Sequence, residues 1–112
     1  MRSNYCGELS KKHINKTITV CGWVLRRRDH GGVIFLDIRD KTGIVQVVVN
    51  PENKKSFSLA EKIRSEFVLK ISGKVNERPE DAENEDLTTG VIEIIADEIC
   101  LLYTSPSPRD DG

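Results

Sequence analysis

Three arginines, a phenylalanine and a double glycine lie close together in the segment RRRDHGGVIFLDIRD, residues 26–40. Within it Ile34, Leu36 and Ile38 alternate with more polar positions, so a strand that buries these three residues turns Phe35 towards solvent. An exposed ring is suited to unpaired nucleic-acid bases, because a base stacked on an aromatic side chain gains about 1–3 kcal/mol. The segment therefore predicts a stacking platform beside cations that attract phosphate.

Two further polar side chains occupy non-core positions of expected strands. Gln46 interrupts the valines of IVQVVVN, residues 44–50, and Glu93 lies opposite the isoleucines of VIEIIADEI, residues 91–99. An amide offers both a donor and an acceptor to the edge of a splayed base, and a carboxylate accepts from amino or imino groups. Arginines at the end of a strand meet phosphates or a base edge. Together these residues predict a surface that stacks on bases and reads their edges.

Each of these residues also has a purely structural interpretation. Isolated exposed phenylalanines are common, and a run of arginines is usually a solvated strand end. Asp37, Arg39 and Asp40 fit surface ion pairs of small energetic value. The binding interpretation is favoured only if the fold brings Phe35, Gln46 and the arginines to one face.

Hydrophobic periodicity predicts the elements that position them. A change to helical period over residues 58–67, with Ser58 and Glu61 spaced as a capping box, predicts one helix after the third strand. Gly22 inside the first strand suggests a bulge or bend, so the direction in which each arginine points stays open. The fold class is all-β with one inserted helix, a five-stranded OB-fold barrel that binds ligands across its second and third strands. The expected strands span residues 17–28, 33–40, 44–50, 67–75 and 91–99.

Composition restricts the remaining classes of function. A chain of 112 residues suits one domain, and a net charge of −1 places any nucleic-acid site in a local cluster such as Arg26–Arg28. The sequence has neither a long apolar run nor a secretory leader, which predicts a cytoplasmic protein. Three cysteines, an odd number without metal-type spacing, argue against a disulfide framework or a metal site. No pattern of a nucleophile with its base is visible, so the sequence predicts no catalytic residue.

The end of the chain departs from the strand pattern. Residues 100–112, beginning CLLYTSPSPRD, resemble the translation of a sequencing-library adapter, although a Ser/Pro linker has a similar composition. We therefore expect a domain over residues 1–99, a non-native tail over residues 100–112, and a native gene that continues beyond Ile99.

Four motifs carry a specific resemblance. The stretches MRSNYCGEL, VCGWVLRRRDHGGVIFLDIRD, GIVQVVVNPE and TTGVIEI resemble the N-terminal domain of bacterial aspartyl-tRNA synthetases across residues 1–99. In that family the domain is an OB-fold that grips the tRNA anticodon. The resemblance implies that Phe35 stacks on the middle base, that Arg28 and Gln46 read the middle and neighbouring bases, and that Glu93 reads the first.

The resemblance also assigns residues at the margins of the site. Arg78 and Asn84 match loop positions near the third base, and Arg26 adds attraction for the RNA strand. The loop that contains His30 resembles that of non-discriminating enzymes, which also charge the asparagine tRNA. The implied partner is therefore the anticodon loop of the aspartate tRNA, with the asparagine tRNA as a possible second partner left open.

The whole enzyme of that family uses ATP and magnesium to form aspartyl-adenylate and transfer the aspartyl group to tRNA, and it is a homodimer. These steps belong to a C-terminal domain outside this chain, so we expect the fragment to hold no cofactor and to catalyse no reaction alone. Three alternatives stay open: a general single-stranded nucleic-acid binder, the corresponding domain of an asparaginyl or lysyl enzyme, and a fragment without appreciable binding.

Overall fold

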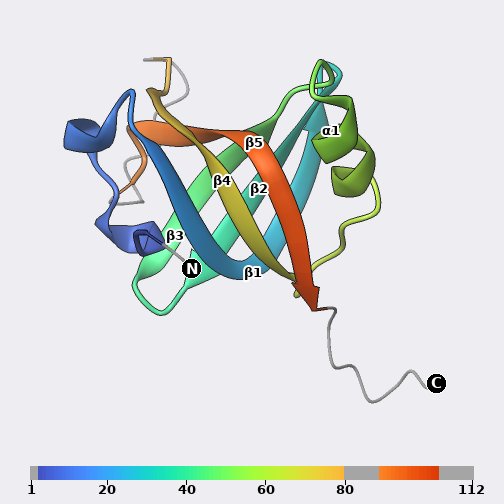
Figure 1. The fold of residues 1–112 in the computed structure, drawn as a ribbon, viewed down its shortest axis with the longest axis horizontal. Helices are drawn as coiled ribbons and strands as arrows, with labels where there is room; N and C mark the ends of the chain where they lie inside the picture. The colour runs from blue at the N-terminus through green and yellow to red at the C-terminus, as the bar shows by residue number, and fades with distance from the viewer. Residues whose placement is uncertain (1–2, 80–88, 104–112) are drawn as a thin grey trace.

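The computed structural model describes residues 3–79 and 89–103. Five strands close into a barrel in the order β1-β2-β3-β5-β4, and one helix connects β3 to β4 (Figure 1). The predicted fold class, all-β with a single inserted helix, is confirmed. The elements are β1 (Thr17–His30), β2 (Val33–Asp40), β3 (Gly43–Val49), α1 (Lys54–Ala60), β4 (Val68–Glu77) and β5 (Ile92–Tyr103), preceded by two short 3-10 turns, η1 (Cys6–Glu8) and η2 (Lys11–His13).

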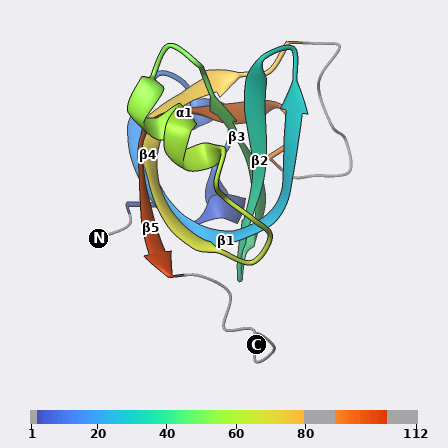
Figure 2. The ribbon, with the colours of Figure 1, turned by 90° about the vertical axis from the view of Figure 1, so that its right-hand side faces the viewer.

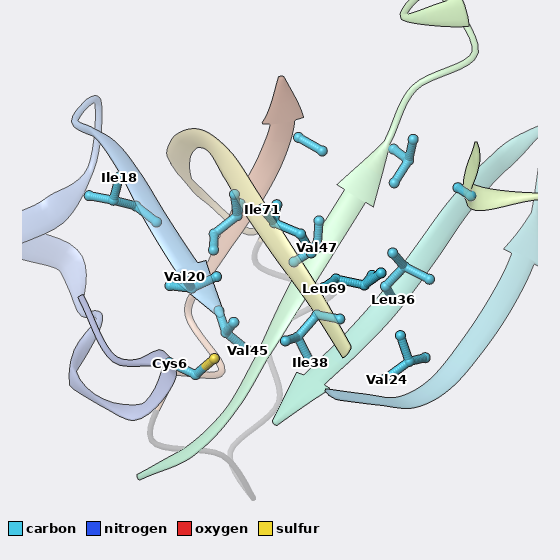
Figure 3. Packing of buried hydrophobic residues seen from close by; sticks show 14 of the residues in the cluster. Cys6, Ile18, Val20, Val24, Leu36, Ile38, Val45, Val47, Leu69 and Ile71 are labelled. Carbon is cyan, nitrogen blue, oxygen red and sulfur yellow. The ribbon is translucent and has the colours of Figure 1, made fainter. Parts of the chain in front are cut away.

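The core fills the barrel with branched aliphatic side chains from every strand (Figure 3). Along β2, β4 and the first half of β1 they alternate with less buried residues, which is the period-two pattern that predicted the strands, since successive side chains point to opposite faces of a sheet. In β3 the residues from Val45 to Val49 are all buried. Cys6 of η1 is fully buried in the same cluster, and burial raises the pKa of its thiol. The buried set includes Ile18, Val20, Val24, Leu36, Ile38, Val45, Val47, Leu69 and Ile71.

Strand β1 is shared between two halves of the barrel. Its first half pairs with β4 from Thr17 to Trp23, and its second half pairs with β2 from Trp23 to His30. Gly22 lies where β1 and β2 approach closely, because a Cβ there would meet the carbonyl oxygen of Arg39 at 2.5 Å. The register shift, however, lies between Val24 and Arg26. The bulge suspected at Gly22 is thus displaced, with Leu25 as the extra residue.

The bulge reverses the alternation of side chains along β1. Before it, the even-numbered Val20 and Val24 are buried. After it, Arg27 pairs with the buried Leu36, and the even-numbered Arg28 pairs with Phe35 on the outer face. One inserted residue therefore moves the arginines to the opposite face from the one that simple alternation assigns.

The helix begins and ends earlier than predicted. It spans Lys54–Ala60 rather than residues 58–67, because the side chain of Asn53 accepts a hydrogen bond from the backbone N–H of Ser56 and acts as the N-cap. The amide of Asn53 also donates to the carbonyl oxygen of Asp97 at 2.7 Å, which ties the helix to β5. The expected capping box at Ser58 was wrong, since an earlier residue both caps the helix and anchors it.

Strand β5 runs further than residue 99. Cys100 and Leu101 pair with Lys70 and Leu69 of β4, so the first residues of the predicted tail continue the sheet. The expected end of this strand was wrong, while the adapter origin of residues 100–112 stays a prediction. Residues 104–112 lie outside the part of the chain that the structure describes.

Different segments of the chain cover the two ends of the barrel. Helix α1 lies at one end, and the 3-10 turns lie at the other (Figure 1). Asp40 anchors the 3-10 end, accepting from the backbone N–H of Cys6 at 2.7 Å and from the backbone N–H and hydroxyl of Thr42 at 2.8 and 2.6 Å. Burial raises the pKa of the Asp40 carboxyl, but these hydrogen bonds outweigh it and hold the pKa below its ordinary value. Asp40 is therefore a buried anchor, not the surface ion-pair residue that the sequence suggested.

Two structural features are absent from the described residues. None of the helices there is both long and apolar enough to traverse a bilayer. Nor do His, Cys, Asp and Glu side chains within residues 3–79 and 89–103 form a group able to hold a metal ion.

Candidate nucleic-acid interface

The outer face of β1, β2 and β3 carries the predicted site residues. Arg28 pairs with Phe35, and Arg26 pairs with Asp37, which in turn pairs with Gln46. Paired residues of neighbouring antiparallel strands lie on the same face of the sheet. The bulge in β1 thus brings the two arginines beside the aromatic ring and the amide.

Phe35 is only partly exposed, because another side chain covers it. The guanidinium carbon of Arg28 lies 5.4 Å from the centre of the Phe35 ring, within the range of a cation–π contact. Arg28 Nη2 also pairs with Asp37 Oδ1 at 3.2 Å. The prediction of a ring facing water was therefore right about the face but wrong about full exposure.

Gln46 and Glu93 extend this arrangement across the barrel. Arg28 Nη2 donates to Gln46 Oε1 at 2.8 Å, and Gln46 Nε2 donates to Glu93 Oε1 at 2.9 Å. Gln46 is 7% exposed and Glu93 is 9% exposed, so the outer-face positions predicted to meet solvent are in fact buried. Burial raises the pKa of the Glu93 carboxyl, and its hydrogen bond from Gln46 and the charge of Arg78 offset this only in part.

Arg78 completes the charged surroundings of Glu93. It follows the end of β4, its backbone N–H donates to Val91, and its Nε donates to the carbonyl oxygen of Ile92 at 3.0 Å. Its side chain is buried, and burial lowers the pKa of the guanidinium although Glu93 and Asp37 favour its charge. Periodicity gave no signal for Arg78, which the resemblance alone had assigned.

We call Arg28, Asp37, Gln46 and Glu93 the base-edge network. Every member is hydrogen-bonded to another, so the side chains are held in defined orientations before a ligand arrives. Among the described residues, Arg28 Nε is a buried side-chain nitrogen without a hydrogen-bond partner. The sequence analysis did not identify Asp37 as a site residue. Its position two residues after Phe35, on the same face of the strand, was the pattern that could have identified it.

The remaining predicted residues lie at the margins or outside the described chain. Arg26 is exposed on the same face as Arg28. His30 is exposed at the tip of the β1–β2 hairpin, beside Gly31 and Gly32, whose φ angles of 60° and 81° have the sign that a type I′ turn requires. Among the described residues, His30 forms no hydrogen bond or ion pair with the base-edge network. Asn84 lies outside the described residues.

Comparisons with known proteins agree with this geometry. The family model of tRNA anti-codon OB-fold nucleic acid binding domains matches residues 18–102. The chain is 53% identical over 108 residues to an aspartate--tRNA(Asp/Asn) ligase of Legionella pneumophila (strain Corby), and the match covers 96% of this chain and 18% of the relative. The chain thus spans about a fifth of the length of this curated relative.

Two solved structures show the same architecture. The asparaginyl-tRNA synthetase of Pyrococcus horikoshii is 30% identical with a TM-score of 0.76, and the match covers 91% of this chain and 23% of that one. The aspartyl-tRNA synthetase of Entamoeba histolytica is 25% identical with a TM-score of 0.79, and the match covers 92% of this chain and 21% of that one. In both cases the similarity is to one part of a longer protein.

Proposed function

The chain belongs to the tRNA anti-codon family of OB-fold nucleic acid binding domains, and from this premise we propose that it reads the anticodon of an aspartate tRNA. The observation that carries the proposal is the hydrogen-bonded chain from Arg28 through Gln46 to Glu93, beside the ring of Phe35. Phe35 and Gln46 lie on β2 and β3, the strands that OB-folds use for oligonucleotides, and the side chain of Arg28 reaches them from β1.

Base recognition proceeds by exchange of hydrogen bonds. A splayed base stacks on Phe35 once the Arg28 guanidinium moves from the ring, and the freed donors of Arg28 turn to the base edge. The amide of Gln46 and the carboxylate of Glu93 then exchange their mutual hydrogen bond for bonds to bases. A base of the wrong pattern leaves one of these buried groups without a partner, which costs about 1–3 kcal/mol.

The parent protein in this proposal is an aspartate–tRNA ligase. The relative from Legionella is named for both the aspartate and the asparagine tRNA, which supports a domain that accepts both anticodons. ATP and magnesium belong to the catalytic part of such an enzyme, and this chain contributes recognition of the tRNA alone. A homodimeric parent is part of the same proposal.

The test compares RNA stem-loops that differ only in the anticodon. We expect the isolated chain to bind a GUC stem-loop better than a scrambled triplet at moderate salt, with modest affinity because the acceptor end of the tRNA is absent. Gln46→Ala should bring the two affinities together, while Lys74→Ala, an exposed residue of β4, should leave their ratio unchanged. Equal binding of both loops by the wild type would instead indicate a general single-stranded nucleic-acid binder.

A further inference from the structure

A second candidate site lies beside the base-edge network, at the distal half of β1. A cleft of about 560 Å³ lies between β1 and the segment that follows α1. Four basic residues and one acidic residue line it: Arg26, Arg27, Lys62, Arg64 and Glu61. The protein as a whole has a net charge of −1. This local excess of positive charge is therefore a property of the cleft and not of the general surface.

The walls of the cleft are held by backbone and core contacts. The guanidinium of Arg27 donates to the carbonyl oxygens of Ala60 and Glu61 at 3.2 and 2.7 Å, which satisfies acceptors at the end of α1. The backbone N–H of Glu66 donates to Val24 at 2.7 Å, so the segment between α1 and β4 is fastened along β1 (Figure 2). Arg27 thus positions the cleft rather than offering its charge to a ligand.

The same segment directs two cations outwards. Ile63 is 3% exposed and belongs to the core, while its neighbours Lys62 and Arg64 are exposed. Within residues 3–79 and 89–103, neither of these cations nor Arg26 forms an ion pair. The cleft therefore presents three cations that no acidic side chain of the described structure neutralises.

Arg26 connects this cleft to the base-edge network. It lies two residues before Arg28 on the same face of β1, a separation of roughly 7 Å along the strand. That spacing is comparable to one nucleotide of an extended RNA strand. A strand that places a base on Phe35 and runs along β1 towards Arg26 would bring an adjoining phosphate to the cleft.

We propose that Arg26, Lys62 and Arg64 form a phosphate cleft that binds the RNA backbone next to the bases read by the network. This rests on the proposed function for the identity of the ligand. Arginine offers a planar fork for two phosphate oxygens, and lysine offers a compact charge. Because phosphates are the same in every sequence, the cleft contributes affinity and orientation but no discrimination between anticodons.

The first test removes the two cations that lie outside the base-reading strands. Lys62→Ala/Arg64→Ala should weaken binding of GUC and scrambled stem-loops by the same factor and reduce the magnitude of the salt slope by about 1.4, since each contact with a single strand contributes about 0.7. The matched control is Lys11→Ala/Lys12→Ala, which removes two exposed charges from η2 at the opposite end of the barrel. A salt slope that falls no more than in the control would overturn the proposal.

The ratio of affinities distinguishes the two proposals. If the Lys62/Arg64 variant changes the preference for GUC, these side chains read bases and the phosphate assignment is wrong. If the wild type shows no preference but the salt slope still falls, the phosphate cleft stands and the anticodon assignment fails. Thermal melting of both double variants should match the wild type, because all four side chains are exposed.

A second test identifies the phosphates. Stem-loops with one neutral methylphosphonate linkage at successive loop positions should show at least one position where neutralisation weakens binding by the wild type but leaves the Lys62/Arg64 variant unaffected. If every linkage affects the wild type and the variant equally, the cleft does not contact the loop backbone.

Discussion

At the residue scale, Phe35 serves two partners in turn. In the free protein its ring carries the Arg28 guanidinium at 5.4 Å, and in the proposed complex it carries a base. Because the ring is half-buried, Phe35→Ala should lower the free energy of unfolding by about 1 kcal/mol, the typical size for such a change. RNA binding should weaken by about 1–3 kcal/mol. Urea denaturation and RNA titration measure the two effects, and a stability loss above about 3 kcal/mol would identify Phe35 as a core residue.

In the proposed function Glu93 serves base recognition, while its burial lowers the stability of the protein. Burial raises the pKa of its carboxyl, so its contribution to stability is complete below the ordinary value of 4.5 and is lost as the pH rises through the raised pKa of the folded state. Glu93→Gln should therefore increase the free energy of unfolding at neutral pH, and the gain should shrink as the pH falls through the raised pKa of the folded state and be absent below 4.5. The same variant should lose preference for the GUC anticodon.

The control for this prediction is Glu98→Gln, an exposed carboxylate on the same strand. It should leave both stability and preference nearly unchanged. If Glu93→Gln destabilises the protein at neutral pH, the hydrogen bond and the Arg78 charge outweigh the cost of burial, contrary to the assigned direction.

At the element scale, Asp40 joins the η1 turn to the β2–β3 hairpin. Its carboxylate accepts from two backbone N–H groups and one hydroxyl. Asp40→Ala leaves these donors without their acceptor and should lower the free energy of unfolding by about 1–3 kcal/mol. RNA affinity of the folded fraction should not change, since the partners of Asp40 are Cys6 of η1 and Thr42 of the β2–β3 turn, and none belongs to the base-edge network.

The pH dependence of this stabilisation follows from the direction in which the pKa of Asp40 is shifted. The pKa of Asp40 lies below its ordinary value of 3.8 in the folded state, so its stabilisation is present above 3.8 and is lost as the pH falls through the folded pKa. The stability difference between the wild type and Asp40→Ala should be constant near neutral pH and decrease in acid. A difference that does not depend on pH would show that the carboxylate charge is not what holds the turn.

Sequence patterns predicted elements better than their ends. Alternation in residues such as Ile34, Leu36 and Ile38 is a direct consequence of a two-sided strand and identified all five strands. The helix was misplaced because Asn53 gains a second partner in β5, a long-range contact that a local capping pattern does not contain. The extension of β5 through Leu101 depends on pairing with β4 and is likewise not local.

The sequence predicted the sheet face on which the candidate site residues lie, but it did not predict how deeply they are buried. Parity assigned Phe35, Gln46 and Glu93 to the outer surface correctly. Their burial arises from contacts among side chains of different strands, such as the bond from Gln46 to Glu93 across 47 residues of sequence. Such hydrogen-bond networks form only when the barrel closes, so the sequence pattern of a single strand does not predict them.

At the scale of the whole molecule, we propose that the hairpin tip decides whether the domain accepts one tRNA or two. The aspartate and asparagine anticodons share two bases, and His30 lies exposed at a turn of two glycines. We expect GUC and GUU stem-loops to bind with a ratio near one, and the ratio to grow in His30→Leu. A strong preference for GUC in the wild type would refute this relaxed specificity, and Lys41→Ala in the β2–β3 turn is the control that should leave the ratio unchanged.

The bulge at Leu25 has a consequence for how this domain tolerates change. The side chain of Leu25 is 43% exposed, so replacing it with a polar residue should alter stability by about 0.5 kcal/mol or less. Deleting it should restore regular pairing, because Val24 and Arg26, which pair with Ile38 and Asp37, would become consecutive, so Arg26 and Arg28 would keep the outer face while the local bend of the bulge is lost. What this position contributes is therefore local bend and twist of β1, and not the face on which the later arginines lie.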